Sequence, residues 1–574
     1  MFGLSTYSYD DDGFRTCGVT GLHIHRSAED MVKLYGVTAI VMLAIGGIAA
    51  FFVPMTRWEA IGLLSPQTFY TDLSLHAWYL LVFWMVFIEI AILYVGGPFV
   101  LGRRLPLQRL SKAAYGVMIG GVALVTYGIL TATPPNAAPM DTSYPPLPSP
   151  AVFYLGAIVF ILGTILAALP FLVTIWKEKR ERPHETLPLI AFGAFITSIV
   201  ALEALVGGLM AYVPTFFWRM GWLPTMDPAL YRQWWWILGH GTQQINLLAM
   251  ITIWYFMTHV VGGAEVASEK VSRTAFVLYL FFINLGAAHH LMADPASGVF
   301  WKMWNTSYAM YGAVFASMVH AFAIPAGLEV GRRRKGLGGG TFGWLWSAPW
   351  RDPGFSATIL SIILFGFFGG ITGVMMGQMQ LNMTWHNTFA VPGHFHATVA
   401  TGTTLAFMGL GYYVLRLVFG RDWVGGTLAT IQPYLYGGAM GIVCLMMMYL
   451  GVLFGIPRRD PQVMTIPGTS WSFATPTTHL IFAIYGIAAL FAILGGALFV
   501  GIVVTSLVRG ETFAGDMPVD RSMLADGSGE ASDPEPPHAQ SMRGTFVFVL
   551  VFFATFVALY ALNWFLLSQV WQIG

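Results

Sequence analysis

Six histidines of this chain lie in or at the ends of long apolar segments, where an imidazole is an unusual residue. An ionisable side chain is costly inside a lipid bilayer, so a group of such side chains indicates a metal or proton site. Imidazole nitrogen is a preferred ligand of copper, iron and zinc. The residue types therefore point to a metal centre. The six residues are His76, His240, His289, His290, His394 and His396.

His394 and His396 are two residues apart, which places them on different sides of one helix. At about 100° per residue they point about 200° apart, so they cannot bind the same ion. They can instead hold two cofactors that flank the helix. His76 is left as a second ligand beside His396, which would complete a six-coordinate haem, while His394 alone suits a five-coordinate haem.

His289 and His290 are adjacent at the end of an apolar run and lie about 100° apart on a helix. Both can converge on one ion together with His240 from the preceding run. Three imidazoles around one ion suit copper, iron or zinc. The spacing therefore predicts a three-histidine site beside the two haem ligands.

The elements that must position these residues are transmembrane helices. The chain is 56% hydrophobic and 10% charged, with a mean hydropathy of +0.66. A membrane helix needs about 20 apolar residues, and only helices or closed barrels span lipid. We therefore predict an all-α polytopic membrane bundle of about 13 transmembrane helices. The apolar runs are 33–54, 75–98, 112–132, 151–176, 187–213, 232–258, 272–292, 303–329, 355–379, 386–418, 428–453, 475–507 and 544–571.

Basic residues gather in alternate connections, such as "KEKRERPHE" and "GRRRKG". By the positive-inside rule these connections are cytoplasmic, and so is the N-terminus. All six histidines then share one depth in the outer half of the bundle. A net charge of +1 gives no reason to expect a nucleic-acid partner. The partner expected around the helix bundle is membrane lipid.

The chain has two cysteines, Cys17 and Cys444, in separate contexts and no CxxCH motif. It therefore encodes neither a dinuclear copper centre nor a covalently attached haem. Electrons must enter through a second subunit that carries such a centre. The sequence assigns no role to Cys17, His23 or His25.

The segments "LHAW", "WWWILGH", "HHLMADP" and "HNTFAVPGHFH", in this order, resemble subunit I of the haem–copper oxidoreductase superfamily. Thirteen helices and "GIPRRDP" resemble its B-type branch. The resemblance implies two haems, expected to be b-type, and one copper, with non-haem iron as the alternative. It makes His76 and His396 the axial ligands of the low-spin haem and His394 the ligand of the high-spin haem. The second metal would be bound by His240, His289 and His290.

Four further residues match family positions near the haem propionates, namely His386, Asp294, Arg458 and Arg459. Arginines at the outer face could offset propionate carboxylates. The resemblance also implies a second subunit with a dinuclear copper centre or a c-type haem. Its electron donor would be cytochrome c or a small copper protein, and the location a prokaryotic cell membrane.

The resemblance divides the chain into four parts. Residues 1–31 would be a polar cytoplasmic segment, and 32–507 a haem–copper catalytic core of twelve helices. The range 508–543 is acidic and rich in Pro, Gly and Ser, which predicts a flexible cytoplasmic linker. Residues 544–574 would form the thirteenth transmembrane helix.

Gln244 departs from the oxidase pattern. Oxidases of the A and B types carry a tyrosine four residues after the first copper-ligating histidine, and this chain has Gln244 there. Four residues are about one helical turn, so Gln244 should face the same site as His240. An amide cannot supply the electron and proton that such a tyrosine gives to dioxygen cleavage. Gln243 and Asn246 are expected to hold helices together.

Coupling of two nitric oxide molecules to nitrous oxide needs only two electrons and two protons, and the family's nitric oxide reductases carry Glu at this position. The sequence therefore favours a nitric oxide reductase with Gln244 as a catalytic residue. A B-type dioxygen reductase with another electron source is the alternative, and a cofactor-free transporter is a distant one.

Proton supply is a second departure from the B-type pattern. The family's Ser and Thr positions on the eighth helix hold Ala316 and Val319 here, counted from His289 without gaps. Thr252 and Tyr255 on the sixth helix remain. The sequence thus predicts a reduced cytoplasmic proton path.

Overall fold

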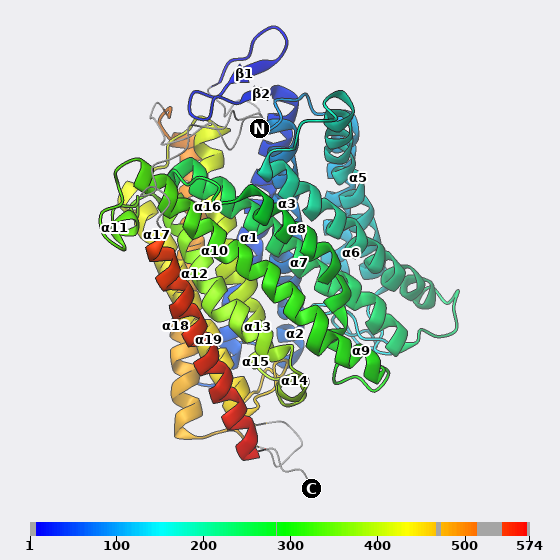
Figure 1. The fold of residues 1–574 in the computed structure, drawn as a ribbon. Helices are drawn as coiled ribbons and strands as arrows, with labels where there is room; N and C mark the ends of the chain where they lie inside the picture. Colours follow the sequence, from blue (N-terminus) through cyan, green and yellow to red (C-terminus); the bar gives the residue numbers. More distant parts are fainter. Residues whose placement is uncertain (1–6, 283, 466–471, 514–541, 571–574) are drawn as a thin grey trace.

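The computed structural model describes residues 7–282, 284–465, 472–513 and 542–570. Its helices form one bundle, and the first helix begins at the end of the bundle opposite to the one where the last helix ends (Figure 1). The first seven apolar runs form α1 (Arg26–Arg57), α2 (Pro66–Ala77), η1 (Trp78–Phe83), α3 (Trp84–Tyr94), η2 (Val95–Phe99), α4 (Gln108–Leu130), α5 (Ala151–Glu181), α6 (Leu189–Arg219), α7 (Pro228–Gly262), α8 (Glu269–Phe282) and η3 (Asn284–Leu291).

The remaining runs follow the same pattern, with short helices between some of them. They form α9 (Val299–Trp304), η4 (Asn305–Ala309), α10 (Met310–Arg334), α11 (Gly343–Trp346), α12 (Pro353–Leu364), η5 (Phe365–Gly370), α13 (Ile371–Met376), α14 (Met379–Trp385), α15 (Ala390–Phe395), η6 (His396–Thr403), α16 (Thr404–Leu417), α17 (Gly426–Phe454), α18 (Pro476–Arg509) and α19 (Arg543–Val570).

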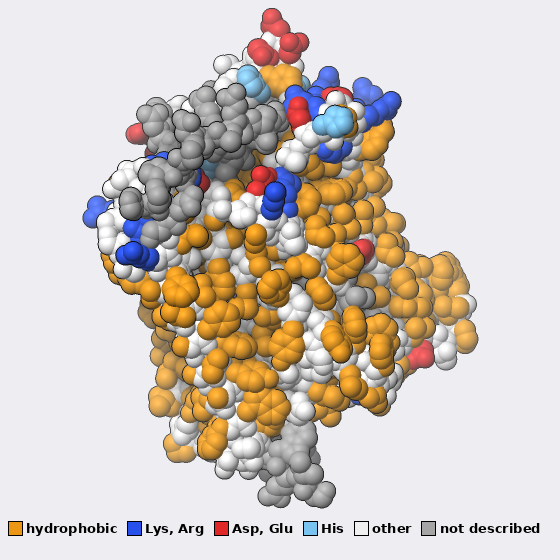
Figure 2. All heavy atoms as spheres, in the orientation of Figure 1, with side chains coloured by type: hydrophobic (Ala, Val, Ile, Leu, Met, Phe, Trp, Pro, Cys, Tyr) orange, Lys and Arg blue, Asp and Glu red, His pale blue; other side chains and the backbone are white. Residues whose placement is uncertain are grey.

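The prediction of an all-α polytopic membrane bundle is confirmed. Within the described residues, 11 helices are long and apolar enough to cross a membrane. The two other predicted spans are also helical, but α8 has only 14 residues before η3 begins. The tenth span, α15–η6–α16, is less apolar because it carries two histidines and four threonines. Figure 2 shows the apolar belt, with most charged side chains gathered at one end.

Several spans contain short π-helical segments instead of a regular α-helix. η1 begins two residues after His76, and η6 begins at His396 itself. η5 precedes Thr372, which contacts His394. Inserted π-turns are rare and occur frequently at functional sites, because they redirect side chains. A sequence argument that assumes 100° per residue cannot anticipate them.

From residue 7 onward, the N-terminal segment is folded against the bundle. β1 (Phe14–Thr16) and β2 (His23–His25) form an antiparallel hairpin directly before α1. Arg15 pairs with the fully buried Glu29 at 2.8 Å and donates to the carbonyl of Leu417 at 2.6 Å. The predicted polar tail 1–31 therefore contains a packed hairpin, and the first helix begins at Arg26 rather than after residue 31.

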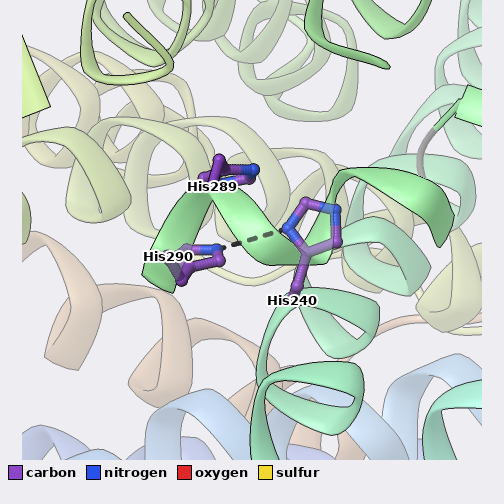
Figure 3. A group of neighbouring side chains, drawn as sticks. All are labelled: His240, His289 and His290. Atoms are coloured by element: carbon purple, nitrogen blue, oxygen red, sulfur yellow. Dashed lines mark hydrogen bonds between the residues drawn. The ribbon is translucent and has the colours of Figure 1, made fainter. Parts of the chain in front are cut away.

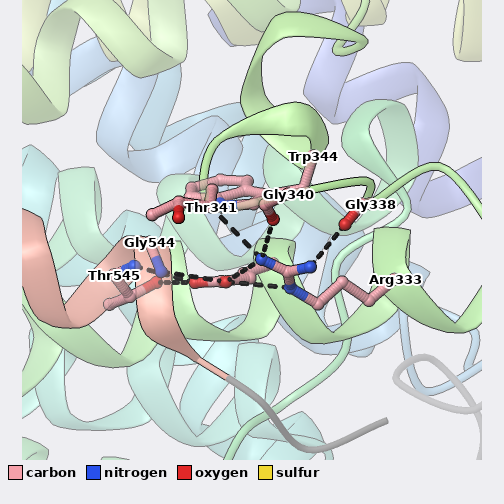
Figure 4. Close-up of polar contacts among 8 residues, drawn as sticks. Arg333, Gly338, Gly340, Thr341, Trp344, Gly544 and Thr545 are labelled. Atoms are coloured by element: carbon pink, nitrogen blue, oxygen red, sulfur yellow. Dashed lines mark hydrogen bonds and ion pairs between the residues drawn. The ribbon is translucent and has the colours of Figure 1, made fainter. Parts of the chain in front are cut away.

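The last helix is joined to the bundle at its N-terminal end. Glu329 of α10 is fully buried, and its carboxylate accepts hydrogen bonds from the backbone N–H of Gly544 and Thr545, at 3.1 and 2.8 Å. Arg333 binds the same carboxylate at 2.7 Å, and Figure 4 shows this group. A carboxylate at a helix N-terminus satisfies unpaired N–H groups and favours the helix dipole. Most of the predicted linker, 514–541, lies outside the described residues.

Candidate functional site

Three histidines converge at the side of α7. His240 projects from α7 toward His289 and His290 on η3, as Figure 3 shows. One ring nitrogen from each histidine lies within 4.8 Å of the others, and His240 Nδ1 lies 3.3 Å from His290 Nε2. Such a set of neutral nitrogens can hold one transition-metal ion.

Contacts around the cluster fix the direction of its rings. His289 Nδ1 lies 2.5 Å from the carbonyl oxygen of Gly286, so an N–H at Nδ1 leaves Nε2 free to bind a metal. The indole ring of Trp236, one turn before His240, stacks on His290 with ring centres 3.8 Å apart and planes 3° apart. The cluster is therefore oriented before any ion binds.

His76 and His396 form a second, different arrangement. Their rings are parallel to within 12°, and the ring centres are 6.2 Å apart. A metal held by two imidazole nitrogens at about 2.0 Å each separates the ring centres by about 6 Å. His396 Nδ1 lies 2.7 Å from the carbonyl oxygen of Pro392, which leaves Nε2 for a metal. The pair fits an iron between two axial imidazoles.

His394 lies on the same helix as His396 but faces elsewhere. Its Nδ1 lies 3.0 Å from the hydroxyl of Thr372. A Cβ at Gly373 would come within 3.0 Å of the His394 ring, so a glycine leaves the space that the imidazole occupies. Thr372 and Gly373 thus fix the ring against the bundle and leave its other nitrogen toward a cavity.

These histidines line two different large cavities. A cavity of about 840 Å³ is lined by His76 and His396. A second cavity of about 540 Å³ is lined by His394 together with the three-histidine cluster. Both volumes are in the range of sites for large organic ligands. The cavity that holds His76 and His396 is called cavity I below, and the other cavity II.

Arginines gather where the two cavities approach each other. Arg57, Arg458 and Arg459 line cavity I, and Arg458 also lines cavity II. Arg459 pairs with Asp141 at 2.9 Å and also binds the hydroxyl of Tyr144. The buried Nε atoms of Arg57 and Arg458 have no hydrogen-bond partner in the part of the chain that the structure describes. A buried, unsatisfied guanidinium N–H fits an anionic ligand group such as a haem propionate.

Two residues expected near propionates, Asp294 and His386, do not themselves line either cavity. Asp294 forms a bidentate ion pair with Arg232 of α7, at 2.6 and 3.1 Å, so its carboxylate already has a cationic partner. His386 follows α14 and lines neither cavity.

Gln244 lines cavity II with His240 and the other cluster histidines, and its buried Oε1 has no hydrogen-bond partner among the described residues. Gln243 lines the same cavity, and no described residue bonds its Oε1. Within the described chain the buried Nδ2 of Asn246 also lacks a partner. The role of Gln243 and Asn246 in holding helices together stays a prediction.

Comparison with known proteins decides the family. The family described as "Cytochrome C and Quinol oxidase polypeptide I" matches residues 30–491. Cytochrome c oxidase subunit 1 of Thermus thermophilus is 30% identical over 439 residues, which cover 75% of each chain. The chain belongs to the haem–copper oxidase subunit I family. It is thus the catalytic subunit of a membrane oxidoreductase.

Two further matches to this subunit I have lower sequence identity. Quinol oxidase subunit 1 of Bacillus subtilis is 23% identical over 450 residues, which cover 74% of this chain and 65% of that protein. A solved structure of a haem–copper terminal oxidase dimer shares the fold with a TM-score of 0.78 at 24% identity. The matched region covers 94% of this chain and 92% of the chain in that structure.

A buried polar chain approaches cavity II of this subunit I from α8. The hydroxyl of Tyr255 donates to Ser272 at 2.8 Å and lies 3.0 Å from His320 Nδ1. The His320 ring stacks on Tyr279, whose hydroxyl donates to Ser317 at 2.9 Å, and Ser317 lines the cavity. Between His320 and Tyr279 the described residues show a ring contact and no hydrogen bond, so the reduced cytoplasmic proton path stays a prediction.

Several residues of the site escaped the sequence interpretation. Arg57 ends the first span, Arg232 begins the sixth and His320 is embedded in the eighth. A charged or ionisable residue inside or next to an apolar run was the available signal. Thr372 and Gly373 gave no such signal, because only the folded chain brings them to His394.

Proposed function

We propose that this subunit I reduces two nitric oxide molecules, with two electrons and two protons, to nitrous oxide and water. This proposal rests on Gln244. Gln244 lines the cavity of the three-histidine cluster, no described residue hydrogen-bonds its amide oxygen, and it occupies the position where oxygen-reducing relatives need a redox-active phenol. An amide cannot donate an electron, but it can accept or donate a hydrogen bond to a bound substrate.

The cofactors follow from the three groups of histidines. We assign a low-spin haem to His76 and His396, a high-spin haem to His394, and copper to His240, His289 and His290. When bound, they supply the electrons and the positions at which the substrate binds. The buried guanidinium groups of Arg57 and Arg458 would bind propionates, and Gln244 would orient the substrate by a hydrogen bond.

Electrons would enter at the face where Arg57, Arg458 and Arg459 border cavity I. We propose that a second subunit with a dinuclear copper centre or a c-type haem docks there and receives electrons from cytochrome c or a small copper protein. By the positive-inside rule this face lies outside a prokaryotic cell membrane, and α1 begins at the cytoplasmic face.

Dioxygen reduction is the second candidate, because the relatives named above are oxidases. It requires a fourth electron from a side chain. Trp236 is the best placed redox-active residue, since its ring lies against His290. Trp236→Phe would then abolish dioxygen turnover while leaving nitric oxide turnover in place.

Replacing Gln244 tests the first candidate. Gln244→Ala should lower nitric oxide turnover by about 10²–10³, the usual cost of losing a hydrogen bond made only in the transition state. Asn246→Ala is the matched control, because this buried amide lies on the same helix but does not line the cavity. Unchanged nitric oxide turnover in Gln244→Ala, with native haem spectra, would remove Gln244 from the mechanism.

A further inference from the structure

Glu89 of α3 is a buried carboxyl group that no basic side chain neutralises in the described part of the chain. Four glutamates are buried there, and the other three form ion pairs with arginines. These pairs are Arg15–Glu29, Arg103–Glu178 and Arg333–Glu329. Glu89 is 7% exposed, and no described residue hydrogen-bonds its buried Oε1. A buried carboxylate without a cation or a donor is costly, so the neutral acid is the stable form of Glu89.

Glu89 lies deep in its membrane span. In the most apolar part of the span Pro66–Phe99, 83% of the residues are buried inside the bundle. The carboxyl group therefore faces other helices and not lipid headgroups. Phe99, where the span ends, is ten residues further along the chain, which is about 15 Å along the helix axis. An ionisable residue at such a place in a membrane protein indicates a functional role.

The side chain of Glu89 lies beside the part of α3 that borders both cavities. Met85, four residues earlier, lines cavity I, and Val86, three residues earlier, lines cavity II. Residues three and four positions apart are neighbours on a helix surface. Helical side chains also lean toward the N-terminus of their helix, so Glu89 extends toward Met85 and Val86. The carboxyl group is thereby directed toward the boundary of the two cavities.

A second polar atom without a protein partner lies on the wall of cavity II that faces α3. The helix α3 packs against α7, and Gln243 of α7 lines cavity II together with Val86. No described residue bonds the Oε1 atom of Gln243. Buried polar atoms that lack a protein partner commonly bind ordered water. Water held at Gln243 would place a proton carrier between Glu89 and the cavity.

We propose that Glu89 is a proton donor to cavity II. The neutral acid stores one proton inside the membrane, and its O–H bond breaks when the reduced centre consumes a proton. The proton passes through water at Gln243 to the substrate oxygen that leaves as water, and a proton from the aqueous phase then restores the acid. The electrons come from the reduced donor. Both candidate functions form water, so the role of Glu89 does not depend on which gas is reduced.

Infrared difference spectroscopy of the holoenzyme tests the stored proton directly. The reduced-minus-oxidised spectrum of the parent should contain the C=O band of a protonated carboxyl group, and this band should shift in D2O. Glu89→Gln should remove the band and leave the haem spectra unchanged, because the amide has nearly the same shape. Glu203→Gln is the matched control, since Glu203 also lies within a membrane helix, α6, but lines neither cavity. A band that persists in Glu89→Gln would overturn the proposal.

Proton uptake during a single turnover tests the transfer itself. The reduced enzyme would be mixed with nitric oxide or with dioxygen, whichever it reduces, in the presence of a pH-indicator dye. Glu89→Gln should slow proton uptake by about 10², a common effect of losing a proton-transfer group. Glu203→Gln should take up protons at the parental rate.

The variant Glu89→Asp separates a proton donor from a residue that only packs. It keeps an acid, so its infrared band should move instead of vanishing, and its proton uptake should be slowed less than in Glu89→Gln. This variant also keeps the test available if Glu89→Gln does not assemble with haem. Parental proton uptake in Glu89→Gln, or in Glu89→Asp an infrared band identical to that of the parent, would overturn the role of Glu89. The preference between nitric oxide and dioxygen should not change in either variant.

Discussion

His394 and His396 lie two residues apart on one helix and line different cavities. His396 faces His76 across cavity I, with ring centres 6.2 Å apart, whereas His394 lines cavity II with the three-histidine cluster. Phe395 lies between them and lines both. The two cavities thereby lie on either side of a single helix, joined by a very short stretch of chain.

Replacing these two histidines should remove different haems. His396→Ala should abolish the low-spin spectrum, because the pair with His76 is broken. His394→Ala should retain that spectrum and disturb the high-spin haem and its carbon monoxide binding. Absorption spectra of the purified reduced variants measure both. Loss of the same haem in both variants would contradict the separation of the cavities.

Removal of a cluster histidine should release the second metal alone. His290→Ala leaves two imidazoles where three nitrogens now lie within 4.8 Å of one another, which is too few for tight binding. Elemental analysis should then find less than half of the parent's copper or non-haem iron and an unchanged haem content. Undiminished metal in both His289→Ala and His290→Ala would refute the site.

The buried polar chain should deliver protons to cavity II. His320→Leu removes the imidazole that contacts the Tyr255 hydroxyl and stacks on Tyr279, and we expect turnover to fall by about 10², a common effect of losing a proton-transfer group. The solvent deuterium isotope effect should rise at the same time. Thr258→Val is the control, because the Thr258 hydroxyl donates to its own helix at Trp254. A His320→Leu enzyme with parental turnover and isotope effect would exclude this route.

The N-terminal hairpin should loosen in acid. His25 caps α1, and its Nδ1 accepts from the backbone N–H of Ser27 at 3.0 Å. Burial, and then the charge of Arg104, lowers the pKa of His25 below its usual 6.5. The folded state thus favours the neutral ring, so this stabilisation is complete above pH 6.5 and is lost as the pH falls through the lowered pKa.

Amide hydrogen exchange in residues 13–28 measures this effect. Exchange of these amides should increase as the pH falls below about 6, after correction for the intrinsic rate, because a protonated ring cannot cap the helix. His25→Asn keeps a capping side chain that does not titrate, and it should remove the pH dependence. A parent protein whose protection stays constant down to pH 4 would contradict the capping role.

Periodicity and composition predicted most of the fold, because membrane spans can be recognised from their length and hydropathy. The convergence of His240 with His289 and His290 followed from residue type and order along the chain. The other residues that complete the site could not be predicted in this way, because they come from segments far apart in the sequence. Arg57 reaches cavity I from the first helix, and Phe553 reaches cavity II from the last. Such long-range contacts depend on packing, which no local pattern records.

The proposal that Gln244 fits this site for a two-electron reaction is tested most directly by one comparison of substrates. A single preparation of the purified enzyme, with its second subunit and a reduced donor, would be supplied with nitric oxide and then with dioxygen. Nitrous oxide formation should exceed dioxygen consumption by at least about tenfold, a difference of about 1.4 kcal/mol in activation free energy. Rapid reduction of dioxygen to water with negligible formation of nitrous oxide would contradict the account.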